Sequence, residues 1–340
     1  MNSLQHDHAM PSGPPAPHHR LRRIALFFFK YVLGISLIAW MVLTGRLDLS
    51  ALGTLPATLL AECLALMLVQ TLLAAVRVRY VLAHQGIQAG LVQCLLFNCS
   101  GVLYSAFLPG GISGDAVRAY LFMKAVPNHR LAILGAMFLD RVLGLLSMVV
   151  LGLCAALYMA MRVEVIRPYL GAFVAIFIAL AGGIALLHFI GSRPGHHEVP
   201  LTRLAGLWAK LRRIITELRI HHYSAGVLAA IIAQSMLIHL TAVAVVYLCS
   251  VQSQSGLGFL EVFVATPIGL LVNAIPLSPG GLGIGENAFE LLYRAIGGRQ
   301  GATAFLMARI FLYSPALIGL AYVLKRMVSK RREAFESPTK

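Results

Sequence analysis

The sequence predicts an all-α polytopic membrane protein, and the composition and the long apolar runs are the observations that predict it. Hydrophobic residues make up 59% of the 340 residues, charged residues 12%, and the mean hydropathy is +0.80. A soluble domain carries about 25% charged residues. The apolar runs are continuous and do not alternate. This favours helices, because a membrane helix needs about 20 apolar residues and a membrane strand about 10 alternating ones.

Six apolar runs are long enough to cross the membrane as helices, at residues 24–43, 55–76, 131–156, 168–190, 224–249 and 302–324. The first run follows Arg20, Arg22 and Arg23, as the hydrophobic part of a signal peptide follows basic residues. Its length, and the lack of a small-residue cleavage pattern after Leu43, indicate an uncleaved first helix. The His- and Pro-rich residues 1–23 are expected to form a disordered cytoplasmic tail.

Two further apolar stretches, 90–109 and 259–276, end at nearly the same short sequence. Each reads Pro-Gly-Gly followed by a carboxylate, which is Asp115 in the first copy and Glu286 in the second. The copies lie roughly 170 residues apart, as matching parts of an internal repeat would. A Pro-Gly-Gly break frees backbone N–H and C=O groups, which a membrane tolerates only against protein or a water-filled cavity. The paired breaks therefore indicate where a binding site lies.

The positive charges favour one topology, because Lys and Arg concentrate on the cytoplasmic side of membrane proteins. If both stretches are ordinary crossings, the chain has eight spans, and the loop with Arg118 and Lys124 and the basic segment 193–219 fall outside. If each stretch is half of a re-entrant hairpin, every basic cluster falls inside, including Arg77 and Arg79 and both termini. We therefore predict about six full spans plus two broken re-entrant helical hairpins, with eight spans as the alternative.

This topology gives each half three full crossings, so the second half is inverted relative to the first. The predicted organisation is a single transmembrane domain, 24–324, with repeat halves at about 24–160 and 168–324. A basic loop at 191–222 and a basic tail at 325–340 are expected on the cytoplasmic side. The amphipathic part of that loop is expected to lie on anionic lipid.

Ionisable residues at membrane depth supply the candidate site, because such charges are costly and usually face a bundle interior. Asp115 and Glu286 hold equivalent positions after the two breaks, and Arg118 follows Asp115 by about one helical turn. Two interpretations stay open: structural ion pairs that lock the hairpins to neighbouring helices, or arginines that hold an anionic head group while the carboxylates pair with them or relay protons. Ser113 and Ser278 are candidate caps of the helices that follow. The predicted substrate-binding residues are Pro109, Gly110, Gly111, Ser113, Asp115, Arg118, Asp140, Arg141, Ser278, Pro279, Gly280, Gly281, Glu286 and Arg309.

The sequence lacks the residue spacings that are typical of metal, catalytic and nucleotide-binding sites. It has no zinc-ligand spacing, nucleophile elbow or Walker loop, and its five cysteines form no Cys-x-x-Cys pair. Gly281, Gly283 and Gly285 do not make a dinucleotide fingerprint, because no strand is expected before them and the spacing differs. We therefore expect no catalytic residue, metal, cofactor or nucleic-acid partner.

Three motifs together resemble a known family. They run from Asn98 to Tyr120 with Leu-Pro-Gly-Gly-Ile-Ser-Gly-Asp at the centre, from Leu139 to Gly144, and from Ile275 through Glu286. In this order, over essentially the whole chain, they resemble the lysylphosphatidylglycerol synthase transmembrane-region family. The resemblance implies a multi-pass protein of the bacterial inner membrane that moves a lipid or lipid-linked group between leaflets. The aminoacyl-transferase domain of the full-length synthases is not in this sequence, so we do not expect this chain alone to transfer an aminoacyl group to lipid.

These observations predict a lipid flippase or lipid transporter that moves a polar or anionic lipid or lipid-linked group. The expected partners are the membrane lipid substrate and anionic lipid at the cytoplasmic surface, with a homodimer or lipid-biosynthesis enzymes as further candidates. The alternative is a membrane enzyme, or a subunit of a lipid- or isoprenoid-modifying complex, in which the carboxylates act as acid and base.

Overall fold

The computed structural model describes residues 17–108, 113–161, 167–192, 215–216, 218, 222–275 and 277–336. These residues form helices and connecting turns, and no strand occurs among them. Pro109, Gly110 and Gly111 of the first break lie outside the described residues, as does most of the predicted basic loop.

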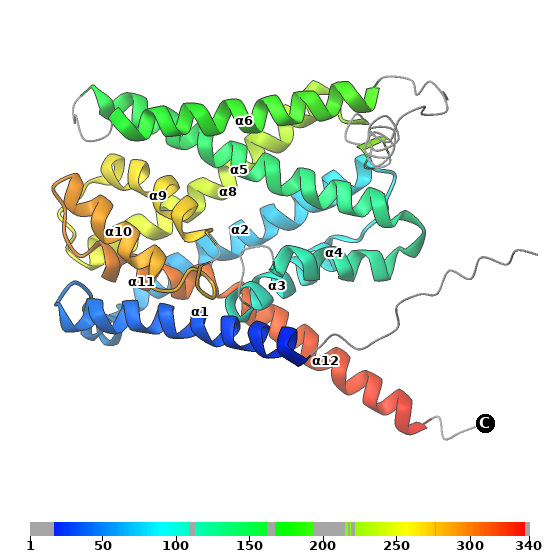
Figure 1. Ribbon diagram of the computed structural model, residues 1–340, viewed down its shortest axis with the longest axis horizontal. Coiled ribbons are helices and arrows are strands. Elements are labelled where there is room, and N and C mark those ends of the chain that lie inside the picture. Colours follow the sequence, from blue (N-terminus) through cyan, green and yellow to red (C-terminus); the bar gives the residue numbers. More distant parts are fainter. Residues whose placement is uncertain are drawn as a thin grey trace, which may run out of the picture.

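Figure 1 shows the helices, which we describe in the order of the two halves that the sequence predicts. The first half contains α1 (Pro17–Leu43), the 3-10 turn η1 (Ser50–Thr54), α2 (Ala57–His84), α3 (Leu91–Phe107), α4 (Ser113–Ala125), η2 (Pro127–His129) and α5 (Arg130–Ala160). The second half contains α6 (Arg167–Ser192), α8 (Ala225–Gln252), α9 (Phe259–Asn273), α10 (Ile284–Ala295), α11 (Gly301–Leu312) and α12 (Pro315–Glu336).

Helix length and composition confirm the all-α polytopic membrane class. Among the described residues, five segments are long and apolar enough to cross a membrane: α2, α5, α6, α8 and the stretch of α11 and α12 over 301–329. They coincide with five of the six predicted spans. The apolar part of α1, Phe28–Leu43, is shorter, as are α3 and α9. α3 and α9 each precede a short helix, α4 and α10, and pack against it as the two arms of a predicted hairpin.

The predicted span 302–324 is wrong in one respect, because it is two helices and not one. α11 ends at Leu312, and α12 begins at Pro315. Proline lacks an N–H and suits the first turn of a helix, so it ends one helix and starts the next. Tyr313 in the break donates its hydroxyl to the Gly280 carbonyl at 3.1 Å. The interruption therefore lies against the second Pro-Gly-Gly segment.

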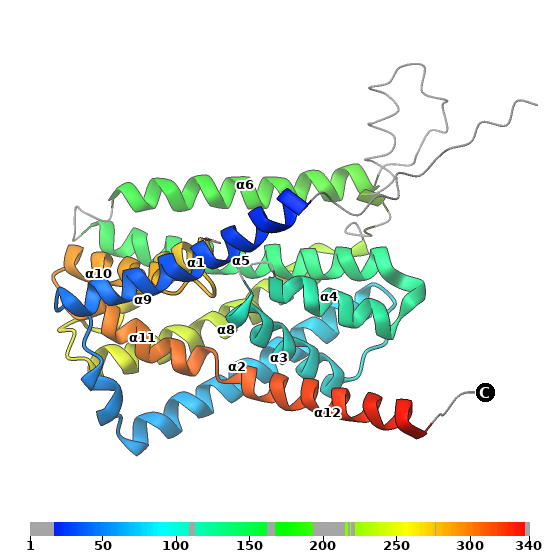
Figure 2. The same ribbon diagram turned by 60° about the horizontal axis from the view of Figure 1, so that its bottom comes forward.

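α2 and α8 run antiparallel through the middle of the bundle. Near the centre of both helices, the Thr241 hydroxyl donates to Gln70 Oε1 at 3.1 Å. Towards one end the Tyr223 hydroxyl donates to the Val81 carbonyl at 2.8 Å, and towards the other Cys63 contacts Cys249. α6 lies along an outer edge in both Figure 1 and Figure 2.

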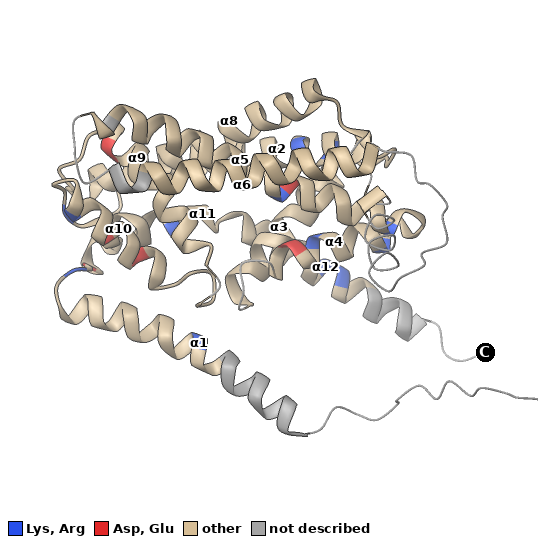
Figure 3. Cartoon of the chain, turned by 45° about the horizontal axis from the view of Figure 1, so that its top comes forward, with Lys and Arg blue, Asp and Glu red and all other residues tan. Residues whose placement is uncertain are grey.

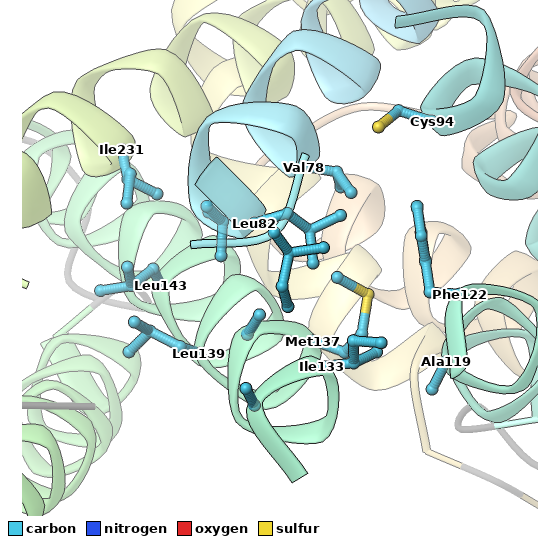
Figure 4. Packing of buried hydrophobic residues seen from close by; sticks show 14 of the residues in the cluster. Val78, Leu82, Cys94, Ala119, Phe122, Ile133, Met137, Leu139, Leu143 and Ile231 are labelled. Carbon is cyan, nitrogen blue, oxygen red and sulfur yellow. The ribbon is translucent and has the colours of Figure 1, made fainter. Parts of the chain in front are cut away.

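The largest packed core joins α2, α3, α4, α5 and α8 (Figure 4). Val78 and Leu82 of α2 meet Phe122 of α4 and Met137 and Leu143 of α5 in this core. Lipid tails are as apolar as leucine, so close van der Waals packing and small residues, and not escape from water, hold membrane helices together.

The two halves exchange packing partners, because α3 packs on α12 and α9 packs on α5. Glycines allow the helices of both pairs to pack closely. A Cβ atom added at Gly319 of α12 would lie 2.4 Å from the Cys99 carbonyl oxygen of α3, and one added at Gly152 of α5 would lie 3.1 Å from Pro267 Cβ of α9. Each hairpin is thus held by the third span of the opposite half.

Candidate functional site

A cavity of about 410 Å³ lies in the interior where both halves meet. α2, α3, α4 and α5 supply most of its wall, and α8, α9 and the break after α11 supply the rest. Figure 3 shows that charged residues are sparse along the helices and that basic and acidic residues lie beside one another inside the bundle. The polar lining consists of Gln70, Arg77, Asn98, Ser105, Asp115, Arg118, Asp140, Arg141, His239 and Tyr313.

Asp140 is the most deeply buried charge of the cavity, with 1% of its surface exposed. Arg77 donates to both carboxylate oxygens, from Nε at 2.8 Å and from Nη2 at 3.2 Å. Arg118 donates to the same carboxylate from Nη2 at 2.9 Å. Two arginines on two other helices therefore offset the cost of burying one carboxylate, and they tie α2 and α4 to α5.

Asp115, in the first turn of α4, continues this network to the open side of the cavity. It forms ion pairs with Arg118, with Oδ1 3.4 Å from Nη2, and with Arg141, with Oδ2 3.0 Å from Nε. The side chain of Asp115 is 24% exposed and that of Arg141 is 50% exposed. The five residues alternate in charge, from buried to open, in the order Arg77, Asp140, Arg118, Asp115 and Arg141. We call them the ion-pair network.

Helix geometry explains why neighbouring residues have different roles in the network. Asp140 and Arg141 are consecutive on α5, and consecutive helical residues point about 100° apart. Asp140 therefore faces α2 and the interior, while Arg141 faces Asp115. Asp115 and Arg118 are three residues apart on α4 and share a face, as the sequence predicts.

Arg77 is a cavity residue that the sequence analysis assigned to a cytoplasmic basic cluster. Its side chain is 11% exposed and also donates to Ser235 Oγ of α8 at 2.9 Å. Arg79, its neighbour in that cluster, is exposed. The available signal was the spacing of Gln70 and Arg77, because residues seven apart lie on one helical face and both are polar in an apolar helix.

Asn98 and His239 also line the cavity although neither was predicted as a site residue. Asn98 Oδ1 accepts from Arg118 Nη1 at 3.4 Å. His239 Nε2 is hydrogen-bonded to the Gly144 carbonyl at 2.8 Å, which joins α8 to α5. Side chains of this kind cannot be assigned to a site from sequence, because their surroundings depend on which helices meet.

Glu286 and Arg309 form a second ion pair, which does not line the cavity. Glu286 is fully buried and accepts from Arg309 Nε at 2.5 Å and Nη2 at 3.0 Å. Arg309 also donates to the carbonyls of Gly280 and Gly281 and to Asn273 Oδ1. The contacts with Gly280 and Gly281 hold the second Pro-Gly-Gly segment, and those with Glu286 and Asn273 join α11 to α10 and α9, so this pair has a structural role in the observed arrangement.

The second Pro-Gly-Gly segment requires its glycines. Gly280, Gly281 and Gly283 have φ angles of +56°, +73° and +78°, a left-handed region that other residues rarely adopt. A Cβ atom at Gly281 would lie 2.2 Å from Asn273 Oδ1. Of the predicted site residues, Ser278, Pro279, Gly280 and Gly281 therefore shape this turn, and none of them lines the cavity.

The predicted cap at Ser278 is wrong. α10 is capped by Gly283, whose N–H donates to Glu286 Oε2 at 2.7 Å, and Ser278 instead donates to the Leu282 carbonyl at 2.8 Å. Ser113 is the first helical residue of α4 and donates to the Leu108 carbonyl at 3.4 Å. At α10 a glycine turn meets the helix start, where serine was expected to act as cap.

Comparison with known families gives one match, and it covers residues 27–319 with the family described as Lysylphosphatidylglycerol synthase TM region. The chain belongs to this family. The match contains every helix from α2 to α11 and the whole ion-pair network. Membership links the protein to lipid modification or lipid flipping in a membrane. No individually curated protein matches the chain significantly.

In this family member, the cavity offers guanidinium N–H groups to an oxyanion and keeps each of its carboxylates beside an arginine. Arginine suits such a role because its planar fork donates to phosphate or carboxylate oxygens in pairs. Within the described residues, no group of three or more His, Cys, Asp or Glu side chains is arranged to hold a metal ion.

Proposed function

We propose that this chain is a lipid flippase or lipid transporter, which moves a polar or anionic lipid or lipid-linked group between the leaflets of a bacterial inner membrane. The observation that carries the proposal is the charged cavity inside an otherwise apolar helical bundle, lined by both halves. Charges at membrane depth usually line a substrate path. The hydrocarbon tails stay in the bilayer while the head group crosses through the interior.

The inverted repeat that the sequence predicts would fit this function, because many transporters build their site at the interface of two inverted halves. α2 and α8 hold matching places in the two halves and cross antiparallel, with Gln70 and Thr241 paired near their centres. An inverted repeat would place its equivalent helices in this way, beside a two-fold axis in the membrane plane. The exchanged packing of α3 on α12 and of α9 on α5 follows the same relation.

The ends of the two hairpins lie close together, which further supports a common site. A Cβ atom at Gly280 would lie 3.7 Å from the carbonyl oxygen of Ala106, near the end of α3. α1 contacts both regions, because the Tyr31 hydroxyl donates to the Phe107 carbonyl and Gly34 lies against Leu282. Broken helices that meet in this way line the midplane sites of transporters.

The proposal is tested by the rate of head-group translocation in proteoliposomes. The double variant Asp115→Asn, Arg141→Gln removes the open end of the ion-pair network, and we expect it to lose translocation. Lys124→Gln is the matched control, because Lys124 is an exposed charge in the last turn of α4. A wild-type rate no higher than that of the double variant would overturn the proposal.

One observation favours the alternative, a membrane enzyme or a subunit of a lipid- or isoprenoid-modifying complex. The Asp115 carboxylate is partly exposed to the cavity, as an acid or base requires. Mass spectrometry of the lipid before and after incubation separates the two functions. A transporter leaves the mass of the lipid unchanged, whereas an enzyme changes it.

A further inference from the structure

Among the described residues, the lining of the cavity has more positive than negative side chains. Its lining contains three arginines, Arg77, Arg118 and Arg141, but only two carboxylates, Asp115 and Asp140. Glu286 and Arg309 neutralise each other. A positive charge in a low-dielectric interior is costly, so the site favours an anionic ligand.

Two hydrogen-bond donors of the lining also lack a partner among the described residues. They are Nε of Arg118 and Nδ2 of Asn98. Both residues are more than nine-tenths buried, with exposures of 9% and 8%. A buried donor without an acceptor costs about 1–3 kcal/mol, so each orphaned atom in a native structure needs an explanation.

The orientation of the Asn98 amide follows from its neighbour. An arginine only donates, so the Asn98 oxygen must face Arg118 Nη1, and it does so at 3.4 Å. The Asn98 nitrogen is then left as a donor beside the arginine. Reversing the amide would set two donors against each other, which excludes that solution.

We propose that the cavity binds a ligand whose phosphate group is not neutralised by a cationic group of the same molecule. The phosphate accepts hydrogen bonds from Arg118 Nε and Asn98 Nδ2, and Arg141 is the third, more exposed contact. A phosphate diester has one negative charge and accepts several hydrogen bonds, which matches one excess arginine and the two orphaned donors. Identification of the phosphate source as a lipid rests on the proposed function, but the binding site itself does not.

This ligand differs from what the family description suggests. A lysyl group would bring additional positive charge into a cavity that already has an excess of it, and like charges at close range repel. The proposal therefore favours an anionic phospholipid over its lysylated form. Arg77 touches neither orphaned donor in this scheme; it is a positioning residue that holds Asp140, which in turn holds Arg118.

The test measures ligand binding by purified protein, separately from translocation. The probes are inorganic phosphate, phosphatidylglycerol and lysylphosphatidylglycerol at equal concentration, with bound lipid counted by native mass spectrometry and phosphate followed by its effect on thermal unfolding. We expect phosphatidylglycerol to be retained about tenfold more than the lysylated lipid, the ratio that about 1.4 kcal/mol produces. Retention of both lipids in equal amounts by the wild type, above the background without protein, would overturn the proposal without any variant.

Asn98→Asp is the sharpest variant, because it keeps the shape of the side chain, removes the donor and neutralises the excess charge. We expect retention of phosphatidylglycerol to fall about tenfold, since a hydrogen bond to a charged group contributes about 1.5–3 kcal/mol. Gln88→Glu is the matched control, because it makes the same chemical change at an exposed position in the turn after α2. Asn98→Leu removes the donor, together with the Oδ1 that accepts from Arg118, and is expected to lower retention without altering the charge.

The outcomes separate the phosphate source from the transport function. If inorganic phosphate binds and the lipids do not, the phosphate site stands and its source is a soluble molecule. Selective lipid retention without translocation in proteoliposomes would support the site and contradict the transport proposal. Unchanged phosphatidylglycerol retention in a folded Asn98→Asp variant, or no binding of any phosphate probe, would overturn the inference.

Discussion

Arg77 of α2 donates two hydrogen bonds to the Asp140 carboxylate of α5, although the residues are 63 positions apart in the chain. Asp140 is also held by Arg118 of α4, so one buried carboxylate joins three helices. Neither charge is stable at this depth without the other, and the shape of the cavity wall depends on both.

Asp140→Leu is expected to reduce stability strongly. It leaves Arg77 and Arg118 buried without their main acceptor, and breaking a buried pair in this way costs about 3–5 kcal/mol. The measurement is the fall in melting temperature of the purified protein, compared with Leu145→Ala, which changes a cavity residue without touching a charge. An unaltered melting temperature would show that the two arginines find other partners.

The Asp115–Arg141 pair is expected to behave in the opposite way, with a small effect on stability and a large one on transport. Half-exposed pairs contribute about 0–1 kcal/mol to folding, and Arg141 is 50% exposed. Asp115→Asn should therefore melt within a few degrees of the wild type while its translocation rate falls. Equal losses of stability and transport would assign this pair a purely structural role.

Glu286→Gln is expected mainly to lower the stability of the protein. Glu286 is fully buried, and its removal leaves Arg309 charged beside the second Pro-Gly-Gly segment, at a cost of about 3–5 kcal/mol. Thermal unfolding of this variant beside Asp115→Asn compares the equivalent carboxylates of the two halves. We expect Glu286→Gln to lower the melting temperature more than Asp115→Asn does. The reverse order would contradict the structural role of the buried pair.

Gly281→Ala is expected to destabilise the protein more than Gly256→Ala. Both glycines have a left-handed backbone, with φ of +73° and +77°, which costs another residue about 1–2 kcal/mol. Only Gly281 also faces a clash, since its Cβ would meet Asn273 Oδ1, whereas a Cβ at Gly256 meets nothing within 4 Å. The difference between their melting temperatures isolates the contact, and equal values would argue against close packing of this turn.

The topology is tested by labelling single cysteines from either side of the membrane, in a background that lacks the exposed Cys154. Two re-entrant hairpins put Lys124→Cys on the cytoplasmic face and Gln254→Cys on the opposite face. The eight-span alternative reverses both. Labelling of the two positions from the faces that the eight-span arrangement requires would contradict the inverted hairpins.

The sequence predicted the helical class, the family and five long spans, because length and hydropathy are properties of one segment at a time. It also predicted the Asp115–Arg118 contact, because residues three apart on a helix share a face. The break at Tyr313 was missed since the run over 302–324 is apolar on both sides of Pro315. Arg77 was missed since an arginine near a helix end resembles an interfacial charge until its partner, Asp140, is known.

The exchanged packing has a consequence for synthesis of the protein. α3 buries Cys99 against Gly319 of α12, which the ribosome makes about 200 residues later, on the order of tens of seconds at about 5–20 residues per second. During that interval α3 lacks this packing partner. Completion of the N-terminal half therefore waits for the last helix, and a nascent chain interrupted before Pro315 exposes an unfinished surface to membrane proteases and insertion chaperones.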